Sequence, residues 1–178
     1  AIALSHYPKL RDKIRHIWFM GGAAIGGNVS PTAEFNIWVD PIAAKLVIGS
    51  GIPMTMVGLD VTTKAEMTRE DEAELRACGK KGAVLAADIL DFMFRRHAEG
   101  GESAMMHDAL ALASAVCPEC LVCRDYFVDV ECDGQFTAGH TMVDQRGRLG
   151  KAPNVSVAME LDLNMFRKWL VESIKQCG

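Results

Sequence analysis

An apolar run, a helix signal and a second apolar run, in that order, constrain the fold of this chain most. Residues 16–20 form a largely apolar run that two glycines end, which is the pattern of a buried strand opening into a loop. Asp40-Pro41 then predicts a helix start, because Asp caps free N–H groups and Pro fits the first helical position. Residues 53–61 predict a second buried strand. Strand, loop, helix and strand form a βαβ unit, which implies a parallel sheet.

The rest of the chain predicts further helices and short strands. Apolar residues spaced among basic ones predict an amphipathic helix over residues 1–15. Other helices are expected over residues 40–48, from a capped start at 68–71, over 81–97, from His107 onward and over 162–175. Short strands are expected at 126–131, 137–143 and 155–160. We therefore predict one α/β domain over residues 1–178, with a Rossmann-like, mostly parallel sheet flanked by helices, short C-terminal strands and a closing helix.

Composition narrows the class of protein. The chain has 178 residues, 49% of them hydrophobic and 24% charged, which fits one ordinary soluble domain. A formal charge of −4 gives no reason to expect nucleic acid or an anionic membrane as partner. No apolar run approaches the ~20 residues that span a bilayer, and residues 1–15 do not resemble a targeting signal. We expect a cytoplasmic protein without nucleic-acid or membrane partners.

The cysteines allow two interpretations. Cys117, Cys120 and Cys123 have the two-residue gaps seen in zinc and iron–sulfur ligation. However, a zinc site needs a second closely spaced pair, and Cys132, which follows, has no such neighbour. Cysteines in Ala- and Val-rich sequence more often pack as small hydrophobic residues. We therefore favour reduced, buried thiols over a metal site or a disulfide framework.

His107-Asp108 stands directly before an apolar, helix-like run. Asp108 would lie in the first turn, where the helix dipole favours a carboxylate even without a function. Taken alone, His107 could be a structural histidine of the core that is hydrogen-bonded to the backbone. Residues 105–106 are apolar and residues 109–115 are so apart from Ser114, and both polar groups are therefore expected against an apolar wall. Burial without partners would cost several kcal/mol, so the pair needs partners or a ligand.

A second polar cluster lies in the Gly- and Pro-containing segment 27–36. Taken singly, Asn28 and Asn36 are explained as turn residues and Glu34 as the start of a helix. Taken together, just after a strand end, they offer the mixed donors and acceptors that bind vicinal hydroxyls. The glycines at 21–27 are too irregular for the dinucleotide fingerprint, and no phosphate-binding loop is present. The cluster favours a sugar over a phosphate.

Six segments spread through the chain carry a more specific signal. They are FMGGA (residues 19–23), GNVSP (27–31), AEFNIWVDP (33–41), VGLDVT (57–62), MHD (106–108) and TMVD (141–144). In this order they resemble the inosine-uridine preferring nucleoside hydrolases, over nearly the whole chain. The resemblance implies that fold and a role in purine or pyrimidine salvage. It also implies hydrolysis of the N-glycosidic bond of ribonucleosides to ribose and free base, through an oxocarbenium-like transition state assisted by Ca²⁺.

The resemblance also implies roles for individual residues. Asp108 resembles a calcium ligand, and His107 resembles the histidine that faces the leaving base. The residues that resemble the ribose-holding set are Met20, Asn28, Glu34 and Asn36. Family members are commonly dimers or tetramers, so a homo-oligomer is expected.

This sequence departs from the family's pattern in one major respect. The opening motif D-x-D-x-G-x-D-D, which supplies the general base and most calcium ligands, does not occur before His16. We therefore expect the chain to be the C-terminal portion of such an enzyme, inactive and without tight calcium binding when alone. Ala109 stands where a proline is usual, and Thr63 where a histidine is common. The alternatives are a ribose- or nucleoside-binding module and a thiolate–metal protein, and nothing in residues 92–106 indicates purine or pyrimidine.

Overall fold

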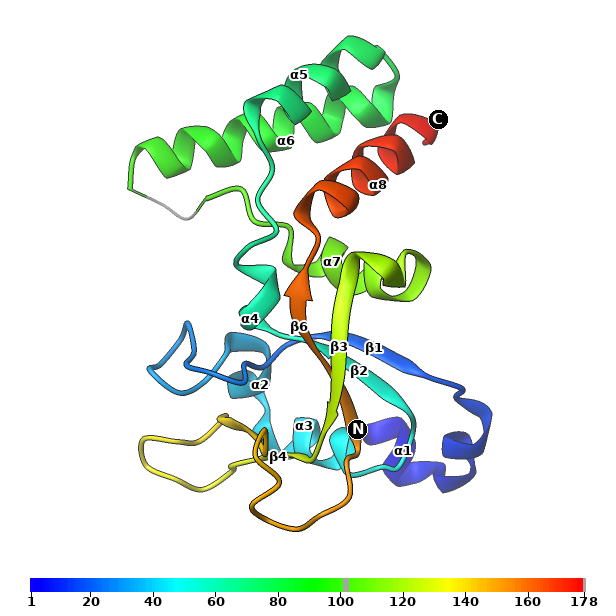
Figure 1. Cartoon of the computed structure of the whole chain (residues 1–178), viewed down its shortest axis with the longest axis vertical. Coiled ribbons are helices and arrows are strands. Elements are labelled where there is room, and N and C mark those ends of the chain that lie inside the picture. Colours follow the sequence, from blue (N-terminus) through cyan, green and yellow to red (C-terminus); the bar gives the residue numbers. More distant parts are fainter. Residues whose placement is uncertain (101–102, 178) are drawn as a thin grey trace. The chain divides into compact units, whose positions relative to one another are not determined.

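The predicted parallel sheet is present in the computed structural model, which describes residues 1–100 and 103–177. Its strands lie in the order β1-β2-β6-β3 (Figure 1). Their bounds are β1 (Ile17–Met20), β2 (Met54–Val57), β6 (Val155–Leu161) and β3 (Leu121–Tyr126). β1 pairs in parallel with β2, and β2 pairs in parallel with β6, so the connection predicted from the sequence is confirmed. The predicted α/β fold class is confirmed with it.

Strand β3 was not among the predicted strands. The N–H of Asn154 donates to the carbonyl of Tyr126 at 3.0 Å, and the N–H of Asp162 donates to the carbonyl of Cys120 at 2.8 Å. Because opposite ends of the two strands meet, β3 runs antiparallel to β6 at the edge of the sheet. Residues 122–125 are all exposed. An edge strand exposed on both faces lacks the apolar alternation that predicts a strand from sequence.

The contacts within the chain divide it into two compact units. Unit 1 is Ala1–Val61 with Leu121–Glu160, and unit 2 is Thr62–Cys120 with Leu161–Gly178. Besides the sheet, unit 1 holds α1 (Ile2–His6), the 3-10 helix η1 (Pro8–Lys13), α2 (Phe35–Val39), α3 (Pro41–Ile48) and the antiparallel pair β4 (Val128–Val130) and β5 (Thr141–Val143). Unit 2 holds α5 (Arg69–Cys78), α6 (Lys81–Ala98), α7 (His107–Val116), the 3-10 helix η2 (Pro118–Cys120) and α8 (Leu163–Gln176). The short helix α4 (Leu59–Thr62) contains the junction between the units.

Three predicted elements are wrong in their extent, and one of them, the strand expected at 137–143, is a strand only over Thr141–Val143 (β5). The helix predicted over residues 1–15 is broken, because α1 ends at His6 and η1 begins at Pro8. Tyr7 between them has φ −128° and ψ 72°, since a proline ring disfavours the helical conformation in the residue before it. The strand predicted over residues 53–61 ends at Val57, and α4 follows it.

The predicted helix starts are confirmed by their capping hydrogen bonds. Asp40 accepts from the N–H of Ala43 at 2.9 Å at the start of α3. Thr68 and Asp71 cap α5 reciprocally, each side chain accepting from the other residue's N–H. Asp162 caps α8 by accepting from the N–H of Met165 at 3.0 Å. These bonds satisfy N–H groups that the first turn of a helix leaves without partners.

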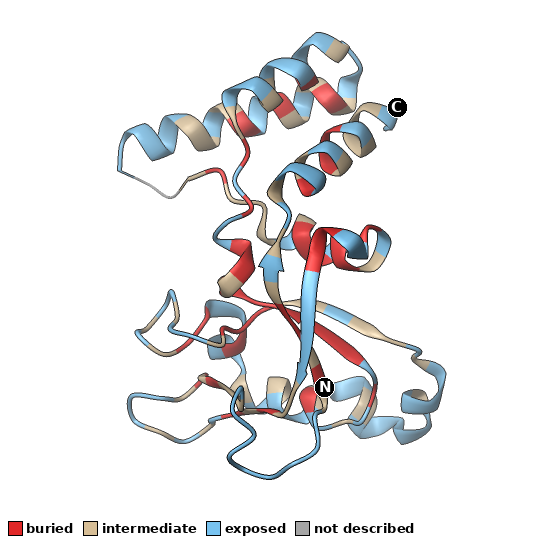
Figure 2. Ribbon diagram, in the orientation of Figure 1, coloured by how far each residue is buried: buried red, intermediate tan, exposed pale blue. Residues whose placement is uncertain are grey.

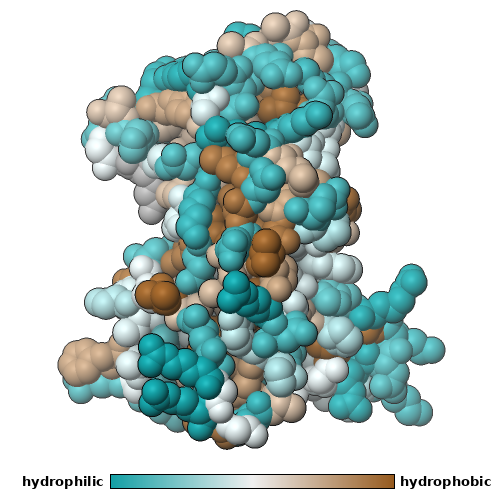
Figure 3. All heavy atoms as spheres, viewed as in Figure 1, coloured by the Kyte–Doolittle hydropathy of each residue, from teal (hydrophilic) through white to brown (hydrophobic). Residues whose placement is uncertain are grey.

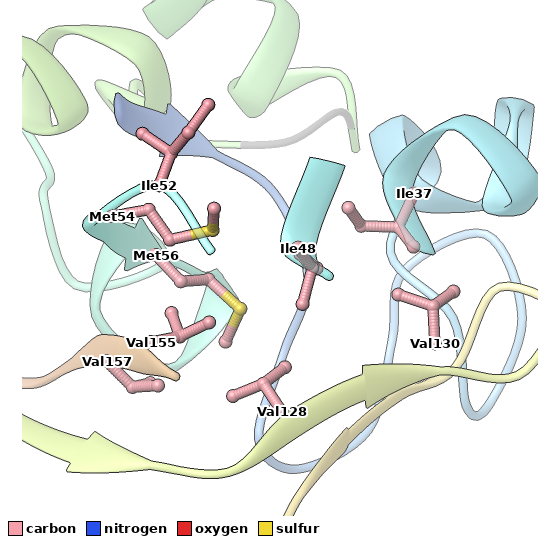
Figure 4. Close-up of a cluster of buried hydrophobic side chains, with 9 residues drawn as sticks. All are labelled: Ile37, Ile48, Ile52, Met54, Met56, Val128, Val130, Val155 and Val157. Atoms are coloured by element: carbon pink, nitrogen blue, oxygen red, sulfur yellow. The ribbon is translucent and has the colours of Figure 1, made fainter. Parts of the chain in front are cut away.

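The hydrophobic core of unit 1 joins the sheet to the helices and to β4 (Figure 4). Met56 of β2 and Val157 of β6 are both 0% exposed. The whole cluster is Ile37, Ile48, Ile52, Met54, Met56, Val128, Val130, Val155 and Val157. Burying one such side chain stabilises a fold by about 1.5–3 kcal/mol, so this cluster holds β2 and β6 together with α2, α3 and β4.

Unit 2 is built on helices. α5 and α6 lie side by side and are joined at Gly79, whose φ of +72° is in the left-handed region that favours glycine (Figure 1). On α6 the buried residues Ala83, Ala87 and Leu90 share one face, and the other residues are intermediate or exposed (Figure 2). The face of α5 and α6 seen in Figure 3 is mostly hydrophilic. Elsewhere on α6 the large apolar residues Leu85, Ile89 and Phe92 are exposed. Within the described part of the chain, no helix is both long and apolar enough to cross a membrane.

Candidate functional site

The loop that follows β1, residues 21–25, is bound by the carboxylate of Glu34. Glu34 is 2% exposed and caps the start of α2. Its Oε2 accepts from the N–H of Gly22 at 2.9 Å and from that of Ile37 at 3.2 Å, and its Oε1 accepts from the N–H of Asn36 at 2.9 Å. Three N–H donors offset the cost of burying this carboxylate. Glu34 therefore joins the loop to α2.

Two further side chains bind the same loop. The Oγ1 of Thr141 accepts from the N–H of Ala23 at 2.9 Å and donates to the carbonyl of Ala23 at 2.6 Å. The carboxylate of Asp60 accepts from the N–H of Ala24 at 2.7 Å and from that of Ile25 at 3.2 Å. Four consecutive N–H groups of the loop, at residues 22–25, thus have side-chain acceptors from three separate segments of the chain. This arrangement fixes the loop's backbone.

Gly22 is required at its position for two reasons. Its φ of +73° lies in the region that side chains disfavour. A Cβ there would also lie 2.8 Å from the Cγ2 of Thr141 and 3.1 Å from the Sδ of Met56. The glycine lets the loop pass against β5 and the core.

The other residues of the predicted ribose-holding set surround this loop. The Nδ2 of Asn36 lies 3.1 Å from the Sδ and 3.4 Å from the carbonyl of Met20, so these two residues are brought together. The Oδ1 of Asn28 accepts from the N–H of Phe35 at 2.9 Å. Asn28 and Asn36 are exposed, whereas Glu34 is buried. The two amides therefore present polar atoms to solvent, and Glu34 supports the backbone beneath them.

His107 and Asp108 open α7 in unit 2. The Nδ1 of His107 lies 2.8 Å from the Oγ1 of Thr62, whose residue is 0% exposed. The sequence led us to expect both polar groups against an apolar wall, but Asp108 is exposed and only His107 is half-buried. The imidazole therefore has the partner that we expected, the Thr62 hydroxyl. Asp108 needs no partner within the protein, because it is exposed to solvent. Its carboxylate stays available to a ligand.

A short backbone pairing positions the start of α7. The N–H of Met67 donates to the carbonyl of Ala104 at 3.0 Å, and the N–H of Met106 donates to the carbonyl of Ala65 at 2.9 Å. These bonds form an antiparallel bridge between residues 66 and 105. His107, the next residue but one, is thereby brought to Thr62.

His107 also lines a cavity of about 610 Å³ within unit 2. Its other walls come from the last turns of α6 and from the segment before α7. They include Phe92, Met93, Arg96, Ser103 and Met105. The cavity combines apolar surfaces with an imidazole and a guanidinium.

Sequence reasoning missed three side chains that these sites depend on. Asp60 and Thr62 belong to the VGLDVT segment, and Thr141 opens the TMVD segment. Both segments carried the family resemblance, yet no residue pattern showed which distant atoms they contact. The predicted site residues fall into two sets: Met20, Asn28, Glu34 and Asn36 in unit 1, and His107 and Asp108 in unit 2.

The described residues do not by themselves fit a complete calcium site. In residues 1–100 and 103–177, no three His, Cys, Asp or Glu side chains are grouped so as to hold a metal ion. Ca²⁺ takes six to eight oxygen ligands, and the carboxylate of Asp108 has only two oxygens. Asp108 can contribute to such a site but cannot form one.

The cysteines lie in a setting that disfavours thiolates. Cys117 and Cys120 are buried free thiols, and Cys123 is an exposed one. Burial raises the pKa of Cys120 to about 12 and raises that of Cys117 as well. Metal ligation requires the thiolate. These observations favour the interpretation of Cys117 and Cys120 as buried structural thiols.

Known proteins are similar to this chain over nearly all of its length. The family described as "Inosine-uridine preferring nucleoside hydrolase" matches residues 1–168. The non-specific ribonucleoside hydrolase RihC of Salmonella schwarzengrund is 45% identical over 174 residues, which is 97% of this chain and 55% of that protein. RihC of Salmonella typhimurium is 42% identical with the same coverage. The chain spans about half the length of the curated relatives it matches.

Solved structures agree with this similarity. A purine-preferring ribonucleoside hydrolase from Gardnerella vaginalis superposes with a TM-score of 0.86 at 33% identity, covering 97% of this chain and 56% of that one. The plant nucleoside hydrolase PpNRh1 has a TM-score of 0.86 at 26% identity, covering 98% of this chain and 58% of its own.

Proposed function

Because the chain belongs to the inosine-uridine preferring nucleoside hydrolase family, we propose that it supplies the ribose-holding and base-facing parts of a ribonucleoside hydrolase. Such an enzyme hydrolyses the N-glycosidic bond to give ribose and a free base. The observation that carries the proposal is the fixed loop after β1, with Met20 in contact with Asn36 and the N–H of Asn36 bound by the buried Glu34. The ribonucleoside hydrolase names of the relatives support the substrate class.

In this proposal the ribose lies against unit 1. Asn28 and Asn36 expose amides, each of which can both donate to and accept from a hydroxyl. Glu34 acts mainly by fixing the loop, because its two oxygens already accept three N–H bonds, and it keeps acceptor capacity for one hydroxyl. Met20 completes the set as an apolar surface beside Asn36. Contacts that tighten as the sugar becomes oxocarbenium-like favour the transition state over the ground state.

His107 faces the leaving base in the same proposal. When the Thr62 hydroxyl donates to Nδ1, the ring carries its proton on Nε2, the nitrogen left for the cavity. The imidazole then donates that hydrogen bond or proton to the departing base. Thr62 is a positioning residue, since it sets the ring's tautomer and orientation without touching the substrate.

Further parts of the proposal concern polypeptide outside these 178 residues. Asp108 contributes one ligand to a calcium site whose other ligands, together with the general-base aspartate, come from outside the chain. The chain alone is then inactive. We also propose a cytoplasmic homo-oligomer, dimeric or tetrameric, acting in nucleoside salvage; size-exclusion chromatography with light scattering tests the oligomeric state.

Ribose release tests the function. We would join to this chain the part of Salmonella schwarzengrund RihC that the chain does not match, in the order of that relative, and refer to the product as the chimera. The chimera should release reducing sugar from inosine and uridine, and the chain alone should release none. A folded chimera that binds ribose without releasing base would instead favour a binding module, and one that does neither would refute the proposal.

A further inference from the structure

Helices α2 and α3 of unit 1 expose four large apolar side chains. Trp38 and Val39 of α2 are 48% and 60% exposed, and Ile42 and Leu46 of α3 are 69% and 39% exposed. Ile42 follows Val39 by three positions and Leu46 lies one turn further along α3, so the four side chains follow one another along the two helices. We call these four residues the α2–α3 face. Contiguous exposed apolar surface marks interaction sites on soluble proteins.

The opposite sides of both helices are already packed. Ile37 of α2 and Ile48 of α3 are buried and belong to the core of unit 1 (Figure 4). Val47 of α3 packs against the same core as Phe19 of β1, and the two line one apolar cavity of about 260 Å³. With about 3.6 residues per turn, Ile42 and Leu46 lie on the other side of α3 from Val47 and Ile48. The α2–α3 face is therefore turned away from β1 and the core.

The remaining part of the enzyme proposed above has a different surface to bind. Among the strands that the structure describes, β1 pairs only with β2, so its other edge is open. The N–H of Ile17 donates to the carbonyl of Pro53, and the N–H of Trp18, the next residue, points to the open edge. An open edge is a template for a further strand. A strand added there would extend the sheet beside β1 and leave the α2–α3 face turned to solvent.

The charges on these helices favour a second copy of the chain as the partner of the face. Residues 38–46 include two charged side chains, Asp40 and Lys45. Asp40 accepts from the N–H of Ala43 at 2.9 Å, and the Nζ of Lys45 lies 2.6 Å from the Oδ1 of Asp129. Residues near a two-fold axis meet their own copies, so an unpaired charge would meet a like charge there. An apolar face whose neighbouring charges are bound within the chain is complementary to itself.

The size of the face fits the core of a two-fold interface. At their exposures the four side chains present on the order of 400 Å² per copy, about half of the ~800 Å² that each partner buries in a standard interface. The rest of such an interface is a polar rim around the apolar core. Trp38 suits the centre, because tryptophan is enriched among the few residues that carry most of the binding energy.

We infer that the α2–α3 face is a two-fold interface between two copies of this chain. The inference rests on the homo-oligomer of the proposed function and assigns the surface through which it forms. Trp38, Val39, Ile42 and Leu46 of one copy pack against the same residues of the other. Because α2 is capped by Glu34 and carries Asn36, the interface also holds the helix on which the ribose-holding set depends.

Sedimentation equilibrium of the chain and of the chimera tests the inference. Both should self-associate at micromolar concentration. Ile42→Lys brings two ammonium groups together across the two-fold axis and should weaken association at least about 100-fold, and Val39→Asp should act in the same way through two carboxylates. Leu85→Lys is the matched control, since it places a lysine at an apolar residue of α6 that is 61% exposed and lies outside the face. It should leave the dissociation constant unchanged.

Three results would overturn the inference: monomers of both proteins at high micromolar concentration, unchanged association in Ile42→Lys and Val39→Asp, or equal weakening by Leu85→Lys. Circular dichroism of each variant excludes misfolding as the cause of a loss. Ribose release by the chimera is read separately. An active chimera that stays monomeric refutes the interface alone. An inactive chimera whose association is lost in Ile42→Lys refutes the hydrolase and leaves the interface standing.

Discussion

Thr141 exchanges two hydrogen bonds with the backbone of Ala23, although 118 positions separate them in the chain. The hydroxyl accepts from the N–H and donates to the carbonyl of the same residue. Thr141 is 2% exposed and Ala23 is 1% exposed, so water does not compete for these bonds. One buried side chain on β5 thereby satisfies both backbone groups of Ala23 in the loop after β1.

Replacing Thr141 with Val should destabilise the fold by about 3 kcal/mol, because it leaves a buried N–H and a buried carbonyl without partners. Urea unfolding followed by circular dichroism measures the loss. Thr141→Ser keeps the hydroxyl and should lose only about 1 kcal/mol with the methyl group. Equal losses in the two variants would show that the hydroxyl is unimportant.

Substitutions at Glu34 and Asn36 should distinguish a loss of fold stability from a loss of activity. Glu34→Gln places an amide N–H₂ against a backbone donor and should cost about 2–4 kcal/mol in the free energy of unfolding. Asn36→Ala removes an exposed side chain and should change stability by less than about 0.5 kcal/mol. In the chimera, both variants should lower kcat as well as raise KM, since the sugar contacts tighten in the transition state. A stable Asn36→Ala chimera with normal kcat would remove Asn36 from the ribose set.

The role of His107 depends on the leaving group. His107→Ala in the chimera should slow inosine hydrolysis more than hydrolysis of a nitrophenyl riboside, whose leaving group departs without a proton. Thr62→Val should show the same pattern more weakly, because the ring loses the bond that sets its tautomer. Equal losses on both substrates would contradict the acid role.

Asp108 should take part in calcium binding in the chimera but not in the chain alone. Calorimetric titration of the chain alone should show no Ca²⁺ binding tighter than about 1 mM, since few oxygen ligands are present. The chimera should lose ribose release in EDTA and recover it with Ca²⁺, and Asp108→Ala should abolish this recovery. Asp133→Ala, which removes a carboxylate from an exposed loop residue, is the control. Normal calcium dependence of the Asp108 variant would exclude it from the metal site.

Cys120 should make the fold less stable in alkali. Burial raises the pKa of its thiol to about 12 in the fold, from an ordinary value of 9.0. Above pH 9 the unfolded chain therefore releases this proton while the folded chain keeps it, so the stabilisation is complete below pH 9 and declines as the pH rises toward 12. Urea midpoints at pH 8 and pH 10.5 should fall less in Cys120→Ala than in the wild type. Removing the exposed Cys177 by Cys177→Ala should leave the wild-type decline, and equal declines in all three proteins would contradict the assignment.

Local signals predicted the helix starts and the first strands. Asp40-Pro41 and Thr68 act through bonds to residues at most three positions away, so the sequence contains both partners. The amphipathic pattern over residues 1–15 was misleading, because the constraint that Pro8 places on Tyr7 outweighs periodicity. β3 escaped prediction because its exposed residues carry no apolar alternation.

The candidate site was predictable in its residues but not in its contacts. The family resemblance supplied Asn28, Glu34 and His107, while Thr62 and Thr141 act across separations of 45 and 118 positions. No single-sequence pattern reports such pairings. The exposure of Asp108 was likewise missed, since apolar sequence neighbours on a helix do not fix which face a residue occupies.

The loop after β1 is a favourable place for redesign of substrate range. The N–H groups of residues 22–25 are committed to Glu34, Asp60 and Thr141, whereas the side chain of Ile25 is 77% exposed. A library that varies Ile25 would therefore change the surface chemistry of the loop on an unaltered scaffold, and varying any of the three anchors would not.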